Sequence, residues 1–135
     1  MHTMPIRLSP GADVRETFER LAQEAGHAGF LVSGIGSLHA AVLRFADQAC
    51  AVTIDGPMEI VSISGSLTRD GAHLHMAVSD RDGRVWGGHV GYGNIVRTTL
   101  EALVVTLPDW SLGREHDPRT GYPELVVRPR GERPA

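Results

Sequence analysis

A single helix signal, followed by a long series of short strand-like segments, limits the folds open to this chain most strongly. Asp13 and Glu16 form a start that resembles a capping box, apolar residues recur at helical spacing as far as Ala25, and Gly26 suits a C-terminal cap. Glycine-bearing turns then separate short apolar runs. One early helix followed by many short strands predicts an α+β fold with a largely antiparallel sheet.

The apolar runs define the expected strands. We interpret the glycine-bearing segments 34–37 and 87–93 as turns rather than phosphate loops, because neither matches a nucleotide-binding fingerprint. The segment 97–107 fits either a strand or a helix. The remaining strands are expected at 6–8, 30–35, 38–46, 51–54, 58–67, 73–79, 84–90 and 125–127.

Length and composition exclude several classes of protein. The 135 residues suffice for one domain, with a core over about residues 4–127 and a loose tail at 128–135. No apolar run reaches the ~18 residues of a membrane span, and the N-terminus lacks a signal peptide, so we expect a cytoplasmic protein without a membrane partner. Cys50 is the only cysteine, which excludes an intramolecular disulfide and a cysteine-based zinc cluster. The net charge of −3 argues against a nucleic-acid-binding surface over the whole domain.

The tripeptide Arg-Asp-Gly occurs at 69–71 and 81–83, each time between two strand-like runs. We predict two three-residue hairpin loops, because glycine suits the left-handed last position of such a loop. Around the first loop, this register places Gly65 opposite His75. Around the second, one face of the hairpin becomes an apolar layer of Leu74, Met76, Val78, Trp86 and Val90.

Three histidines share the other face of the second hairpin. His75 lies opposite His89 and His73 lies diagonal to it, with Cβ separations of ~5 Å and ~7–8 Å. A two-residue loop would move His89 to the other face and split the apolar layer. Three histidines with an open position are the usual ligands of catalytic zinc, so we predict a site for zinc or a similar divalent ion. The alternatives are a solvated strand face or a subunit contact.

Two carboxylates are weak candidates for a catalytic role. Glu59 shares strand alternation with apolar positions 61, 63 and 67, so it could be a partly buried base with a raised pKa. It lies six residues from Gly65, or ~20 Å along a strand, and so would reach the histidines only from another subunit or in a curled sheet. Glu101 lies in the ambiguous segment 97–107. The other histidines are weaker metal ligands: His2, His27, His39 and His116.

Several strings, taken in order, resemble the "plants and prokaryotes conserved" (PPC) domain. They lie at 8–13, 33–37, 56–65, 71–75 and 87–93, and the resemblance covers about residues 4–127. It implies an α+β fold with a strongly bent antiparallel sheet, usually assembled as a homotrimer, with metal ligands at His73, His75 and His89. Apolar residues could cover subunit contacts: Ile60, Val61, Ile63, Val104, Val105 and Leu107.

The resemblance leaves three functional hypotheses open. Stand-alone prokaryotic members are often described as DNA-binding or regulatory, but the hook-like segment 129–134 is interrupted by Glu132, so we expect weak DNA binding at most. The fold is also similar to acetolactate decarboxylase and to a zinc-dependent ester hydrolase, which suggests a zinc-dependent lyase or hydrolase acting on a small carbonyl substrate. The third hypothesis is a trimerisation domain that recruits protein partners.

Overall fold

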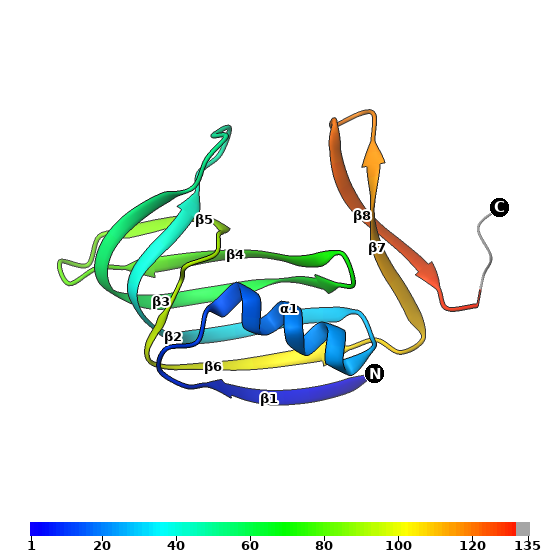
Figure 1. Cartoon of the computed structure of the whole chain (residues 1–135), viewed down its shortest axis with the longest axis horizontal. Helices are drawn as coiled ribbons and strands as arrows, with labels where there is room; N and C mark the ends of the chain where they lie inside the picture. The colour runs from blue at the N-terminus through cyan, green and yellow to red at the C-terminus, as the bar shows by residue number, and fades with distance from the viewer. Residues whose placement is uncertain (132–135) are drawn as a thin grey trace.

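The computed structural model describes residues 1–131, and these residues are mainly β (Figure 1). The expected α+β class is therefore wrong, because the only helix among them has 12 residues and the apolar segment 97–107 is a strand rather than a helix. No helix in this part of the chain is long and apolar enough to cross a membrane. In chain order the elements are β1 (His2–Leu8), α1 (Val14–Ala25), β2 (Gly29–Arg44), β3 (Val52–Thr68), β4 (Gly71–Ser79), β5 (Val85–Val90), β6 (Val96–Thr106), β7 (Trp110–Asp117) and β8 (Tyr122–Pro129).

Six strands form one antiparallel sheet in the order β1-β6-β2-β3-β4-β5. The long strand β2 pairs with β6 over most of its length, and its end pairs with β5 through Leu43↔Val90 and Arg44↔His89. Because β5 also pairs with β4, the sheet bends back on itself at this end, as the curled β2 and β3 show in Figure 1. This bend brings β5, the end of β2 and the start of α1 close together.

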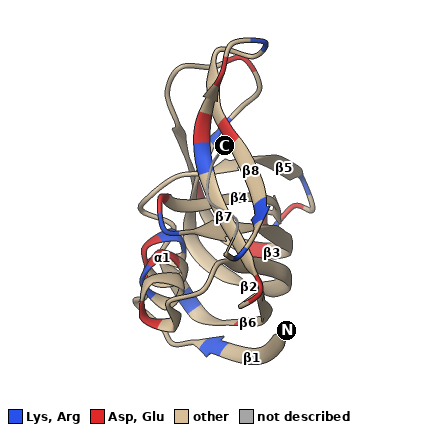
Figure 2. Cartoon of the chain, turned by 90° about the vertical axis from the view of Figure 1, so that its right-hand side faces the viewer, with Lys and Arg blue, Asp and Glu red and all other residues tan. Residues whose placement is uncertain are grey.

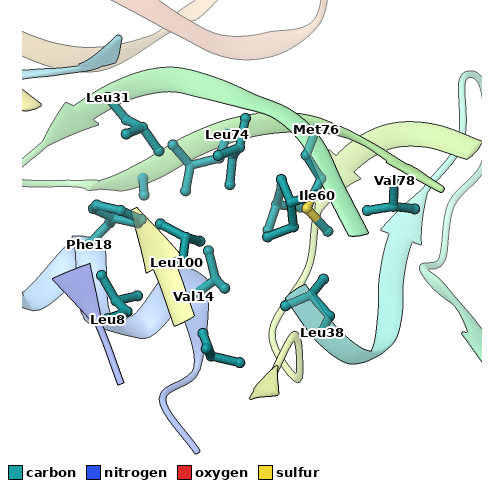
Figure 3. Close-up of a cluster of buried hydrophobic side chains, with 14 of the residues drawn as sticks. Leu8, Val14, Phe18, Leu31, Leu38, Ile60, Leu74, Met76, Val78 and Leu100 are labelled. Carbon is teal, nitrogen blue, oxygen red and sulfur yellow. The ribbon is translucent and has the colours of Figure 1, made fainter. Parts of the chain in front are cut away.

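The helix covers one face of the sheet, as its sequence pattern predicts. The carboxylate Oδ1 of Asp13 accepts a hydrogen bond from the backbone N–H of Glu16 at 3.1 Å, and Gly26 ends the helix with φ = 63°. Val14 and Phe18 are buried against apolar side chains of the sheet (Figure 3). The labelled core residues from the strands include Leu8, Leu31, Leu38, Ile60, Leu74, Met76, Val78 and Leu100.

Two expected breaks in the sheet are absent. The segment 34–37 runs through the middle of β2, and the expected strands 51–54 and 58–67 form the single strand β3. Gly36 pairs with both neighbouring strands, and a Cβ at this position would lie 2.6 Å from the carbonyl oxygen of Thr99. The glycine therefore permits close approach of neighbouring strands and does not mark a turn.

The two Arg-Asp-Gly loops differ. Residues 81–83 form the predicted three-residue loop: the N–H of Asp80 donates to the carbonyl of Arg84, and Gly83 has φ = 77°. Residues 69–71 do not, because Thr68 pairs directly with Gly71 and leaves a two-residue loop. The Thr68 hydroxyl oxygen accepts a hydrogen bond from the N–H of Asp70, which stabilises the tighter turn.

Strands β7 and β8 form a separate two-stranded hairpin that projects from the sheet, hereafter the arm (Figure 1). Strand β7 was not expected from the sequence, in which we predicted a strand only at 125–127 in this region. The expectation of a loose tail at 128–135 is wrong at its start, because Arg128 pairs with Ser111 in the arm and forms an ion pair with Glu115 at 2.8 Å. Residues 132–135 lie outside the described part of the chain.

Candidate metal centre

The three predicted histidines come together on the outer face of the β4–β5 hairpin. His75 pairs with His89 across the two strands, and His73 lies two residues before His75. The imidazole ring centroids are 4.9 Å, 5.1 Å and 5.7 Å apart. Each ring offers one nitrogen that lies within 4.8 Å of the nitrogens offered by the other two. The predicted cluster is therefore present in the fold.

Core packing determines where these side chains lie. Leu74, Met76 and Val78 are no more than 4% exposed, so the residues between them must point to the opposite face of β4. On β3, Ser64 lies opposite His75 and Ser66 lies opposite His73. Gly65, which we expected opposite His75, pairs with Leu74 because the preceding loop is one residue shorter. The histidines nevertheless have small neighbours on this side.

The environment keeps two of the imidazoles neutral. Burial, followed by unfavourable electrostatic interactions with His73, Arg15 and Arg44, lowers the pKa of His89 to about 4. Burial and the Arg114 guanidinium lower the pKa of His73 as well. Neutral imidazole has a free lone pair, which is the form that binds a metal.

One histidine nitrogen has no partner. The Nδ1 atom of His89 is buried and has no hydrogen-bond partner among the described residues. Buried polar atoms without a partner are rare, and a role as a metal ligand is one of the recognised explanations. The Nε2 atoms of His73 and His75 face each other at 3.1 Å.

This donor set fits a divalent ion. Tetrahedral zinc with Zn–N bonds of about 2.0–2.1 Å holds its nitrogens about 3.3 Å apart. Nitrogens within 4.8 Å of one another reach that spacing through small rotations of the rings. Three imidazoles also leave a fourth position open to the surroundings.

The open side of the cluster faces a cleft of about 730 Å³ between the sheet and the arm. His73 and His89 line this cleft, and His75 lines an adjoining hollow of about 380 Å³ that shares His73 with it. The arm contributes Arg114 and Glu124 to both spaces. A cleft of this size is typical for a small-molecule ligand.

Sequence reasoning missed both arm residues at the site. The Arg114 guanidinium donates to the Ser66 hydroxyl at 2.7 Å, and its backbone N–H donates to the Asp70 carboxylate at 2.9 Å. These contacts attach the arm to β3 and to the β3–β4 turn. The signal that could have found the hairpin is the Pro-Arg-Thr-Gly loop at 118–121 between two strand-like runs, with φ = 78° at Gly121.

The two candidate catalytic carboxylates lie elsewhere. Glu59 is exposed rather than partly buried, because a bulge between Ile60 and Ser62 changes the alternation on which the expectation depended. Glu59 and Glu101 line a separate hollow of about 330 Å³. Within one chain, the structure does not bring either residue to the histidine cluster. The weaker histidines, His2, His27, His39 and His116, are outside the cluster as well.

A hydrogen-bonded network centred on Glu19 lies behind the wall of the cleft, to which it contributes Arg15 and Ala72. The Glu19 carboxylate accepts hydrogen bonds from the Tyr92 hydroxyl at 2.7 Å and from the N–H of Ala72 at 3.1 Å, and it pairs with Arg15 at 3.1 Å. Burial raises the pKa of Glu19, but these hydrogen bonds outweigh burial and leave the pKa below its usual value. The network holds Arg15 beside the cleft.

Charges of both signs are mixed along the helix and the arm (Figure 2). Ion pairs such as Arg20–Glu24 and Arg119–Asp117 account for part of this mixture. Among the described residues, the basic positions in this ribbon view are interspersed with acidic ones, which does not favour binding to the phosphates of a nucleic-acid duplex.

Comparisons with known proteins agree with this architecture. The chain is 44% identical over 126 residues to a bifunctional protein GlmU from Synechococcus sp. (strain JA-2-3B'a(2-13)), and it spans 20% of that protein's length and 93% of its own. A hypothetical protein from Salmonella cholerae-suis has 35% identity and a TM-score of 0.92, with 96% of this chain and 94% of that chain covered.

Two further solved structures carry names that bear on function. A metal-containing protein from Archaeoglobus fulgidus has 28% identity and a TM-score of 0.79, with 93% of this chain and 94% of that chain covered. A "putative DNA-binding protein" from Ralstonia eutropha has 26% identity and a TM-score of 0.80, with 92% and 90% covered. The model of the Plants and Prokaryotes Conserved (PCC) domain, the PPC domain of the resemblance above, matches residues 1–108. The chain therefore belongs to the Plants and Prokaryotes Conserved domain family.

Proposed function

We propose that this protein binds one zinc ion, or a similar divalent ion, through His73, His75 and His89. The observation that carries the proposal is the unpartnered, buried Nδ1 atom of His89 within a cluster of three imidazoles whose nitrogens lie within 4.8 Å. The metal-containing relative from Archaeoglobus fulgidus supports it. The open coordination position would face the cleft beneath the arm.

Metal analysis tests the proposal. Protein purified without chelator is expected to contain one divalent ion per chain by elemental analysis, and protein stripped with chelator is expected to regain it. His75→Ala and His89→Ala should lose the metal, while His116→Ala, an exposed histidine on the arm, should keep it. Absence of metal in the wild-type protein, combined with failure to restore it, contradicts the proposal.

A second candidate function is metal-dependent chemistry on a small carbonyl compound, as a lyase or a hydrolase. The observation that favours it is Glu124, a carboxylate that lines both hollows beside the histidines and whose charge acts on His73. A divalent ion held by three imidazoles would supply Lewis acidity to the oxygen of a bound carbonyl group. Glu124 would then accept or donate a proton at the reacting compound.

Hydrolysis of p-nitrophenyl acetate, a generic activated ester, gives a first test of this chemistry. Glu124→Gln should lower the metal-dependent rate by about 10²-fold or more without changing the metal content. Glu115→Gln is the matched control, because Glu115 lies opposite Glu124 in the arm and pairs with Arg128. Equal rates in both variants would exclude Glu124 as the proton-transfer group.

DNA binding is a weaker proposal for this chain, although a relative carries that description. The net charge of −3 and the mixed charges of Figure 2 favour at most weak, strongly salt-dependent binding. Tight, sequence-selective binding in a gel-shift assay at physiological salt would contradict this expectation.

A further inference from the structure

Three arginines from three different elements line the cleft beside the histidines. Arg15 comes from α1, Arg44 from the end of β2 and Arg114 from the arm. The bend of the sheet places Arg44 directly opposite His89 in the β2–β5 pair. Three arginines that are 29 to 99 positions apart in the chain thus line one cleft.

Neutral acceptors hold the guanidinium groups of Arg44 and Arg114, and all three arginines keep unused donors. Arg44 donates to the carbonyl of Gln48 at 3.3 Å, and Arg114 donates to the Ser66 hydroxyl at 2.7 Å. Arg15 donates to the carbonyl of Val90 at 3.2 Å, stacks on the Tyr92 ring at 4.3 Å, and pairs with Glu19. A guanidinium has five N–H donors, so each arginine retains donors for a ligand. Among the described residues, neither Arg44 nor Arg114 forms an ion pair.

The charge balance of the cleft then depends on the metal. The three arginines are accompanied by the lining carboxylates Asp47, Asp70 and Glu124, and by Glu19 behind Arg15. These side chains carry one more negative charge than positive. A divalent ion held by the three imidazoles would reverse this balance to an excess of one positive charge. The loaded cleft therefore favours a ligand that brings negative charge.

We propose that the cleft binds a small molecule with an oxyanion group, either a carboxylate or a phosphate, which accepts hydrogen bonds from Arg44 and Arg114 beside the metal. The inference rests on the proposed metal site and adds the chemical class of its ligand. Planar guanidinium groups recognise both kinds of oxyanion in bidentate fashion. The volume of about 730 Å³ is typical of a cleft that binds a small molecule.

Calorimetric titration of the metal-loaded protein tests this inference with two probes, malonate and inorganic phosphate. At least one probe should bind, and the preferred probe distinguishes the carboxylate source from the phosphate source. Arg44→Gln and Arg114→Gln should each weaken binding about tenfold or more, as expected for loss of a hydrogen bond between charged groups. Arg81→Gln is the matched control, because Arg81 is exposed in the β4–β5 loop outside the cleft. Circular dichroism checks that each variant is folded. If Arg114→Gln releases the arm from β3, the Arg44→Gln variant alone tests the inference.

The outcomes separate this inference from the metal proposal. Metal content is measured on the same samples, so a loaded protein that binds neither probe at millimolar concentration overturns the inference and leaves the metal site intact. Failure of the wild-type protein to load metal overturns both. Equal binding by Arg44→Gln, Arg114→Gln and Arg81→Gln overturns the inference. It is likewise overturned if a DNA duplex loses affinity in the first two variants and neither probe competes with it.

Discussion

Leu74 and His75 are adjacent in β4 but point to opposite faces of the sheet, so their substitutions should have separable effects. Leu74 is 1% exposed and belongs to the apolar core with Phe18 and Leu31. Leu74→Ala removes buried methyl groups and leaves a cavity that the close-packed core fills only in part. We expect the free energy of unfolding to fall by about 3–4 kcal/mol. For a domain of this size, the melting temperature should fall by roughly 10–15 °C.

His75→Ala should have the opposite profile. The side chain is exposed, and its Nε2 atom contacts that of His73 within the same cluster. We expect the unfolding free energy of the metal-free protein to change by no more than about 0.5 kcal/mol, as for other surface positions. Metal affinity should fall by more than about 100-fold, since even the loss of a group that only orients a metal ligand costs 10–100-fold.

Urea denaturation in the presence of chelator measures the first quantity for both variants, and equilibrium dialysis against zinc measures the second. The measurements are made at a temperature where Leu74→Ala remains folded by circular dichroism. The reasoning is refuted if metal-free His75→Ala loses as much stability as Leu74→Ala. It is also refuted if folded Leu74→Ala loses the metal as completely as His75→Ala.

Three further perturbations test other parts of the structure. The folded-state pKa of Glu19 lies below its usual value of 4.5, so the ionised carboxylate stabilises the fold above that pH, and this stabilisation is lost on acidification. In urea titrations below pH 4.5, the unfolding free energy of the wild-type protein should therefore fall more steeply than that of Glu19→Gln. Gly36→Ala should cost about 1–3 kcal/mol, measured by the same method, because the added Cβ would lie 2.6 Å from the Thr99 carbonyl; a neutral effect would contradict the close approach. We expect a homotrimer by light scattering, with a mass near three times 14.5 kDa. Ile35→Glu, at an exposed apolar position of β2, should dissociate the trimer, whereas Val85→Glu, at an exposed position of β5, should not. A monomeric wild-type protein would refute this expectation.

The helix and the β4–β5 hairpin could be predicted because local signals agree with packing in both places. The helix has a cap at each end, and the hairpin has a loop whose glycine fixes the register. This register predicts that His75 pairs with His89, and the structure confirms the pairing. Local chemistry and burial of the apolar layer select the same alignment there, so a short stretch of sequence was sufficient.

The predictions that were wrong concern residues whose conformation depends on contacts with distant parts of the chain. Gly36 resembles a turn residue in sequence, but its role is set by strands that approach from elsewhere in the chain. Glu59 was assigned to the wrong face, because strand alternation fails across the bulge after Ile60. The subunit-contact argument also fails in part, because Ile60, Ile63 and Val104 are core residues, whereas Val61 is 53% exposed.

The arm explains why the metal ligands could be predicted and the rest of the cleft could not. His73 and His75 belong to one strand, so their relation follows from a two-residue period alone. Arg114 and Glu124 reach the same space only because β7 packs against β3 and is attached there through Ser66 and Asp70. No periodicity within the arm encodes that attachment.

Core packing in the β4–β5 hairpin also protects the site against a shift in register. A one-residue slip of β5 would exchange its two faces, so Trp86 and Val90 would leave the core side and Gly87 and His89 would enter it. Burial of a histidine side chain among apolar neighbours without a partner is costly, and removal of Val90 from the core forfeits its hydrophobic stabilisation. Both costs act against the slipped state in every folded molecule, with or without a bound ion. The alignment of His75 with His89 is therefore established by the apolar residues that alternate with the histidines along β4 and β5, and the proposed metal ligands are in position before an ion binds.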